Sequence, residues 1–161
     1  MKDLSHKGTY IIVLHFDRTR IIAVGKLGPV QLKRGYYAYV GSAFGPGGMK
    51  SRLRHHIMPK TRFHWHLDYL DGILKEIWVS EPGARLEHEW AWSLGETSSG
   101  RVPGFGCSDC SCDSHLFYFT SLKRLHKARA ELRKTNTLRS IGLGVLTGSD
   151  PAGQIFPKTQ P

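Results

Sequence analysis

The chain has 161 residues, 23 of them lysine or arginine and 13 aspartate or glutamate, so its formal net charge at pH 7 is +10. This length predicts one domain with a sizeable core, and the excess of positive charge favours a polyanionic partner such as nucleic acid. The sequence has no apolar run of membrane-spanning length and no apolar leader, so we expect a cytoplasmic, intracellular protein without a membrane partner. Three cysteines within six positions do not match a secreted disulfide framework.

The first 43 residues carry three groups of strand signals. Residues 8–16 are dense in β-branched and aromatic side chains, which favours a central strand. Residues 21–24 and 30–32 predict a hairpin closed by a glycine-rich turn. Residues 35–43 place three tyrosines between glycines and predict another strand, on which Tyr37 and Tyr39 share one face.

A glycine-rich loop over residues 44–48 allows a helix to begin near Gly48. The buried stripe of this helix repeats every fourth residue, at Met49, Leu53 and Ile57. Arg52 and His56 are also four residues apart and lie on the flank of that stripe. The sequence therefore predicts a strand carrying phenols that faces a helix carrying a cation and an imidazole.

Residues 63–70 are apolar at helical spacing, which predicts a helix lying on the sheet. His64, His66 and Asp68 alternate along it and would not share one helical face, so we do not expect these three alone to hold a metal. Two interpretations remain open. Either one or two of these side chains make structural hydrogen bonds while the others are exposed, or His64 or His66 contacts a phosphate or orients a water.

Residues 73–79 predict a strand, and residues 84–95 predict a helix with two glutamates. Glu87 shares a face with apolar residues and would point inward, which makes it the stronger candidate for bordering a site, whereas Glu89 is the alternative.

Beyond this helix, a dense group of soft ligands follows a glycine-rich turn, at Cys107, Cys110, Cys112 and His115. These residues suit zinc, but their tight spacing differs from that of paired C-x-x-C knuckles, so we give zinc a low weight. Residues 116–119 predict the last strand.

Residues 121–139 contain seven lysines or arginines and the single acid Glu131, with apolar residues at helical spacing. They predict a basic amphipathic helix that packs one side on the domain and turns the other to a phosphate backbone or to solvent. We therefore divide the chain into a domain over 1–120 and a basic helix with a flexible tail over 121–161. The fold class expected is α+β, with a small mixed or antiparallel central sheet flanked by helices.

Several of these segments resemble the GIY-YIG nuclease family. Gly8-Thr9-Tyr10 and Tyr39-Val40-Gly41 match its two name motifs, and its arginine and the helix partner one turn later fall on Arg52 and His56. The blocks at 35–43, 64–70 and 104–116 resemble a branch of uncharacterised GIY-YIG-like domains, some of them fused to DNA glycosylases. Two departures stand out. An additional hairpin lies between the motifs, and Ser42 occupies the place of a lysine in the excision-repair branch, so Lys50 or Arg54 would have to supply that charge.

The resemblance implies a metal-dependent endonuclease that hydrolyses DNA phosphodiester bonds, with branched or damaged DNA as substrate, in repair or processing. Glu87, or Glu89, whose context resembles the branch-cutting nucleases, would hold one Mg²⁺ or Mn²⁺. Arg52 would bind the scissile phosphate, and Tyr10 or Tyr39 would orient or deprotonate the water, assisted by His56. A tyrosine base would need a lowered pKa.

Two further groups of residues are expected to contribute to this function, one by supporting the site and one by contacting nucleic acid. The supporting residues of the site are Tyr37, His64, His66, Asp68, Glu89, Asp109 and His115. Because the block at 104–116 recurs in the branch that this chain resembles, the resemblance implies, as the alternative to zinc, that Asp109 and His115 brace the active-site loop through hydrogen bonds. The nucleic-acid contacts are Lys50, Arg54, Lys123, Arg124 and Lys127. The alternative function is a non-catalytic nucleic-acid-binding module on the same scaffold, and a zinc-stabilised interaction protein is a third hypothesis.

Overall fold

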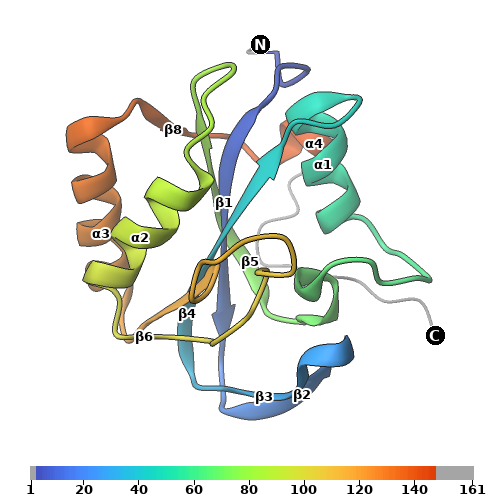
Figure 1. The fold of residues 1–161 in the computed structure, drawn as a ribbon, viewed down its shortest axis with the longest axis vertical. Helices are drawn as coiled ribbons and strands as arrows, with labels where there is room; N and C mark the ends of the chain where they lie inside the picture. The colour runs from blue at the N-terminus through green and yellow to red at the C-terminus, as the bar shows by residue number, and fades with distance from the viewer. Residues whose placement is uncertain (1–2, 148–161) are drawn as a thin grey trace.

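A computed structural model describes residues 3–147, and it shows an α+β domain built on a six-stranded antiparallel sheet (Figure 1). The strand order is β6-β7-β4-β1-β5-β8. The strands of this sheet are β1 (Gly8–Phe16), β4 (Gly35–Ala43), β5 (Ile73–Ser80), β6 (Gly100–Arg101), β7 (Leu116–Phe119) and β8 (Leu138–Ser140). The helices are α1 (Gly48–Ile57), α2 (Glu87–Thr97), α3 (Leu122–Thr135) and α4 (Gly144–Thr147), with 3-10 helices η1 (Gly25–Leu27) and η2 (His66–Tyr69).

Both faces of the sheet are covered, which explains the uninterrupted apolar run in β1 (Figure 1). Ile12 and Leu14 point into the core beneath α1, whereas Ile11 and Val13 point into the core beneath α2 and α3. All four side chains are fully buried. The prediction of a central strand over 8–16 is therefore confirmed, and the expected α+β class is confirmed with every pairing in the sheet antiparallel.

The additional hairpin predicted between the two motifs is present. β2 (Arg20–Val24) and β3 (Gly28–Leu32) form a separate two-stranded sheet at one end of the molecule (Figure 1). Val24, Val30 and Leu32 are buried in the same core as the side chains beneath α1. The hairpin thus extends the core without entering the central sheet, and β1 remains the direct neighbour of β4.

The helix predicted over 63–70 is wrong. That segment is extended up to Trp65 and then makes the short 3-10 helix η2. The cause is the buried carboxylate of Asp68, which accepts hydrogen bonds from the backbone N–H groups of His64 and Trp65 at 2.9 and 3.0 Å. These bonds fold the chain back on itself, and Leu67 and Leu70, three residues apart, fill the core at the spacing of a 3-10 turn.

The helix predicted over 84–95 exists as α2 but begins three residues later. The hydroxyl of Thr9 on β1 donates to the Ala84 carbonyl and accepts from the Leu86 N–H, both at 2.9 Å. These bonds hold the backbone just before Glu87 in a non-helical path. Thr9, the middle residue of the first motif, therefore determines where α2 starts.

The basic helix predicted after residue 121 is α3, and three of its residues, Leu125, Ala128 and Leu132, are buried against the sheet. β8 then pairs with β5, so the sheet gains an edge strand that the sequence did not indicate. Leu143 and Leu146 are buried next to α1. Of the tail for which little fixed structure is expected, residues 148–161 lie outside the described residues.

The register between β1 and β4 pairs Tyr10 with Gly41 and Ile12 with Tyr39. Tyr10 and Tyr39 are therefore two residues apart diagonally and on the same face of the sheet. A Cβ atom at position 41 would overlap the phenol ring of Tyr10. The glycine of the second motif thus makes room for the tyrosine of the first.

We predict that Gly41→Ala displaces the Tyr10 ring and destabilises the domain by about 1–3 kcal/mol, the usual range for overpacking a core. Gly100→Ala is the matched control, because a Cβ there meets only Tyr118 at 3.9 Å. Urea unfolding measures both. Equal stability of the Gly41→Ala variant and the parent would contradict the packing described here.

Candidate functional site

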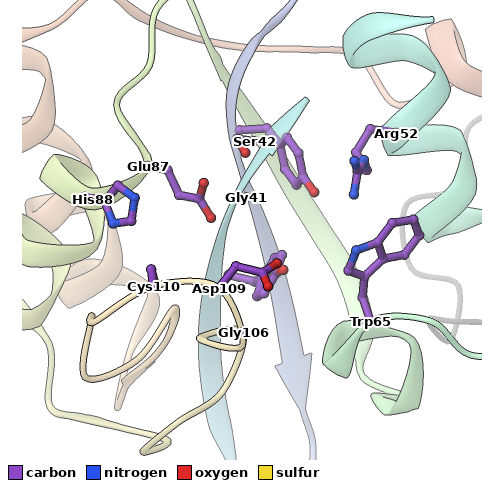
Figure 2. A pocket seen from close by; sticks show the side chains of 11 residues that line it. Gly41, Ser42, Arg52, Trp65, Glu87, His88, Gly106, Asp109 and Cys110 are labelled. Atoms are coloured by element: carbon purple, nitrogen blue, oxygen red, sulfur yellow. The ribbon is translucent and has the colours of Figure 1, made fainter. Parts of the chain in front are cut away.

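A cavity of about 310 Å³ opens where the ends of β1 and β4 meet α1, α2 and the loop before β7 (Figure 2). Four side chains singled out from the sequence line it together: Tyr10, Tyr39, Arg52 and Glu87. Arg52 and Trp65 stand on one wall, and Glu87, His88 and Cys110 stand on the other, with Ser42 between them (Figure 2). Segments 77 residues apart in the chain, from Tyr10 to Glu87, therefore converge on one space.

Tyr10 and His56 are joined by a buried hydrogen bond of 2.7 Å between the phenol oxygen and Nε2. The other imidazole nitrogen, Nδ1, lies 3.7 Å from Oδ1 of Asp68. If Nε2 accepts the phenol proton, Nδ1 carries the ring hydrogen and faces the carboxylate. His56, predicted to flank the helix stripe, is instead fully buried and forms the middle of a Tyr10–His56–Asp68 chain.

Burial determines the protonation of this chain at neutral pH. It lowers the pKa of His56 to about 4, although Asp68 opposes the shift, so the imidazole is neutral. Burial also raises the pKa of Tyr10 well above its usual value, with Tyr39 contributing, and it raises that of Tyr39. Neither phenol is ionised on its own. The lowered pKa that a tyrosine base requires is thus not present in the protein alone, and Tyr10 has a neutral imidazole as its proton acceptor instead.

Asp68 is the most connected buried carboxylate of the site. Besides the backbone bonds that form η2, it accepts a hydrogen bond of 2.8 Å from the Lys60 ammonium, which is itself nearly buried. Burial alone would raise the pKa of Asp68, but the nearby His56 ring and the hydrogen bonds from Lys60 and the backbone outweigh it and lower the pKa strongly. Asp68 is a positioning residue behind the cavity, as the interpretation of structural hydrogen bonds for this segment expected.

Arg52 lies with its guanidinium carbon 4.4 Å from the ring centroid of Trp65. Stacking of this kind holds a guanidinium in place and leaves its N–H groups directed sideways. The arginine ion pairs found within residues 3–147 are those of Arg20 and Arg101. Arg52 is therefore positioned on the wall of the cavity with its donors available to an anion.

Glu87 is the glutamate that reaches the cavity. Its Oε1 lies 3.1 Å from Nδ1 of the buried His115. Burial alone would raise its pKa, but hydrogen bonds from His115 and Ser42 outweigh that effect and lower the pKa, so the side chain is a carboxylate. Glu89 lies elsewhere, where it accepts a hydrogen bond of 3.1 Å from Asn136 on an exposed surface. Geometry thus selects Glu87 from the two candidates.

The loop before β7 forms the floor of the cavity, with Gly106 and Asp109 lining it (Figure 2). His66 accepts a hydrogen bond of 2.9 Å from the Gly106 N–H, so this histidine braces the loop from η2. His115 is fully buried, and its Nδ1 also lies 3.2 Å from the Val40 carbonyl. The predicted bracing role of His115 agrees with these contacts, whereas Asp109 is exposed in the cavity itself.

The soft ligands gather beside Glu87. One ligand atom from each of His88, Cys110, Cys112 and His115 lies within 4.8 Å of all the others. The predicted set is wrong in one member, because the Cys107 thiol is directed to the Phe105 carbonyl at 3.4 Å and His88 from α2 takes its place. Sulfur and imidazole ligands suit zinc better than Mg²⁺ or Mn²⁺, so the low weight given to zinc from spacing alone is reversed for this cluster.

Comparison with known families returned one match, over residues 9–138, to a model described as Domain of unknown function DUF123. The chain belongs to the DUF123 family. Comparison with curated proteins and with solved structures returned no match. The DUF123 match runs from β1 to β8, and thus covers every residue that lines the cavity.

The other predicted residues of this DUF123 domain lie away from the cavity. Tyr37 is buried in the core, where its oxygen accepts a hydrogen bond of 2.8 Å from the Lys33 N–H. His64 is exposed. Lys50 and Arg54 are exposed on α1, whereas the three basic residues of α3, Lys123, Arg124 and Lys127, border a groove with α2. Helices α2 and α3 cover the face of the sheet opposite α1 (Figure 1). The five proposed phosphate contacts therefore form two separate surfaces.

Some residues of the site carry no distinct signal in the sequence. Trp65 stands out only as part of its block, yet it stacks on Arg52, and Thr9 and His88 have no role predicted from the sequence. His88 directly follows Glu87, and that adjacency is the one signal that could have suggested it.

No helix among residues 3–147 is both long enough and apolar enough to span a membrane.

We predict that Asp68→Asn destabilises the domain by about 3–5 kcal/mol, because it leaves the Lys60 charge buried without its partner. Because the folded pKa of Asp68 lies below its unfolded value of about 3.9, its contribution is full above that pH and is lost as pH falls further. Unfolding measured between pH 3 and pH 7 should therefore show a shallower acid loss in the variant.

Asp71→Asn is the control for this measurement, since Asp71 pairs with Arg20 in a half-exposed position and should change stability by at most about 1 kcal/mol. A loss equal for both variants would show that Asp68 has no special structural role.

Proposed function

We propose that this protein is a metal-dependent endonuclease that hydrolyses DNA phosphodiester bonds, with a site of the GIY-YIG type. The observation that supports it most is the convergence of Tyr10, Tyr39, Arg52 and Glu87 on a single cavity, with His56 bonded behind Tyr10. A phosphodiester hydrolase needs a positioned water, a proton acceptor and positive charge around the phosphate. These residues supply each of those groups from fixed elements.

In this proposal Arg52 binds the scissile phosphate through its fork of N–H donors, steadied by Trp65. Tyr39 and Tyr10 orient the attacking water, which forms a new P–O bond while the bond to the leaving strand breaks. The water gives its proton to the Tyr10 oxygen as Tyr10 passes its own proton to Nε2 of His56. Asp68 stabilises the resulting imidazolium, and the leaving oxygen takes a proton from solvent.

Glu87 fits a hard divalent cation, because it is a carboxylate on the cavity wall and its oxygens retain lone pairs beyond the bonds from His115 and Ser42. When bound, Mg²⁺ or Mn²⁺ would supply positive charge against the phosphate. The net charge of +10 and the exposed Lys50 and Arg54 on α1, the helix that carries Arg52, agree with a DNA substrate.

Glu87→Gln should reduce cleavage of plasmid, flapped and branched DNA in Mg²⁺ or Mn²⁺ by at least about 100-fold, the scale seen when one group stabilising the transition state is removed. Glu89→Gln, two residues along the same helix, is its matched control and should cut at the parental rate. Arg52→Ala should lose activity on the same scale, whereas Arg54→Ala, exposed on the same helix, should lose far less.

Cleavage that is equal in the parent, Glu87→Gln and Arg52→Ala would identify a contaminating nuclease. Cleavage lost in Glu89→Gln but kept in Glu87→Gln would contradict the site described here.

The second candidate is a non-catalytic nucleic-acid-binding module. It is favoured by the position of Lys123, Arg124 and Lys127, which border a groove that Glu96 and Glu131 also line, on the face of the sheet opposite α1. This function predicts DNA binding that persists in Glu87→Gln, with no cleavage in any metal.

Replacing the three α3 residues by alanine should make the slope of log K against log salt shallower by about 0.9 for each phosphate that the protein no longer neutralises. A slope unchanged by the triple substitution would remove α3 from the binding surface.

A further inference from the structure

The cluster of His88, Cys110, Cys112 and His115 has no part in the phosphate chemistry above, yet it adjoins the cavity. Three of its members belong to the loop before β7, and His88 comes from the first turn of α2. Nδ1 of His88 lies 3.0 Å from Sγ of Cys112, and Sγ of Cys110 lies 3.2 Å from Nε2 of His115. Two separate elements therefore present four soft ligand atoms to one point.

These distances are close to those of a tetrahedral zinc site. Zn–S bonds of about 2.3 Å and Zn–N bonds of about 2.0–2.1 Å place neighbouring ligand atoms about 3.3–3.8 Å apart. The separations of 3.0 Å for His88–Cys112 and 3.2 Å for Cys110–His115, with no pair beyond 4.8 Å, lie around this range. A set of two cysteines and two histidines is typical of structural zinc.

The surroundings of His115 add an independent indication. Its Nε2 faces the cluster, while its Nδ1 lies 3.1 Å from Oε1 of Glu87 and 3.2 Å from the Val40 carbonyl. A metal-bound histidine commonly donates its other ring N–H to a carboxylate or a carbonyl, because this fixes the tautomer that presents a lone pair to the metal. His115 has both kinds of acceptor in place.

We propose that His88, Cys110, Cys112 and His115 bind one zinc ion, which joins the loop before β7 to α2 and, through His115, holds Glu87 at the cavity. The loop has little regular structure of its own between β6 and β7, so a cross-link to α2 fixes the position of the cavity floor. The role of the ion in holding Glu87 rests on the proposed nuclease function, whereas zinc binding itself does not.

The first test measures metal content and cobalt spectra of the full chain. The parent should hold one zinc per chain, and the Co²⁺-substituted protein should show the strong visible bands of tetrahedral cobalt with thiolate ligands. Cys110→Ser and Cys112→Ser should lose these bands and the stoichiometric zinc. Cys107→Ser is the matched control, a cysteine of the same loop outside the cluster, and should keep both.

His88→Gln tests the ligand from α2, which is exposed and so can be changed without disturbing the core. Its zinc affinity should fall by more than the about 10–100-fold loss typical of an outer-shell partner. Absence of stoichiometric zinc in the parent, octahedral cobalt spectra, or equal loss of zinc in Cys107→Ser and Cys110→Ser would each overturn the site.

The second test asks whether Glu87 is linked to the ion. Glu87→Gln should keep one cobalt per chain but shift the visible bands, since the hydrogen bond to His115 changes the basicity of that ligand. Glu89→Gln, which is directed to Asn136, should leave the spectrum unchanged. Spectra of Glu87→Gln and the parent that coincide would refute the link between Glu87 and the cluster.

The two proposals fail separately. A protein that binds zinc with these ligands but cuts no DNA would reject the nuclease and keep the zinc site. A parent protein that cuts DNA but contains no stoichiometric zinc would reject the zinc site and keep the nuclease.

Discussion

The antiparallel register of β1 with β4 is the constraint on which the rest of the site depends. It pairs Tyr10 with Gly41 and so places Tyr10 and Tyr39 on the same face of the sheet, with Tyr10 in the space that the missing side chain of Gly41 leaves open. A slip of one residue in this register would place the two phenols on opposite faces of the sheet. Because Ile11 and Ile12 must each fill a different core, the packing of both faces penalises such a slip.

A buried polar network on one side of these strands connects β1, α1 and the segment that forms η2. Asp68 binds Lys60 and the backbone of its own segment, and it faces His56, which in turn holds Tyr10. Each of these groups would be costly to bury alone. Lys60 and the backbone satisfy Asp68, and the Tyr10 phenol satisfies Nε2 of His56, so the result is a neutral imidazole placed against a phenol whose proton it can accept.

On the other wall of the cavity, His115 contacts both the Glu87 carboxylate and the Cys110 thiol. Its backbone carbonyl accepts from the Val40 N–H at 2.9 Å, which fixes the residue beside β4, and its two ring nitrogens face Glu87 and Cys110. The carboxylate suits a hard cation and the sulfur suits zinc. One buried histidine thus relates the oxygen ligand of the cavity to the His/Cys cluster, and both depend on the first turn of α2, which Thr9 holds in place.

The sequence by itself determined the elements and most of the candidate residues. Periodicity and β-branched runs located β1, β4, β5, β7, α1 and α3, because burial of one or both faces imposes those patterns on the chain. The resemblance to the GIY-YIG motifs singled out Tyr10, Tyr39 and Arg52, and the apolar face that Glu87 shares on its helix favoured it as the carboxylate, both without the tertiary structure. Local periodicity failed at residues 63–70, where a carboxylate capping its own backbone overrode helical spacing.

Only the tertiary structure decided which of these residues act together. It placed Glu87 in the cavity and Glu89 outside it, and it put His88 rather than Cys107 in the His/Cys cluster. It also placed the basic residues of α1 and α3 on opposite faces of the sheet. None of these outcomes has a local signal, since each depends on how α2 and the loop before β7 approach the ends of β1 and β4. Contacts between residues far apart in the chain are set by packing and by buried hydrogen bonds, which no short stretch of sequence contains.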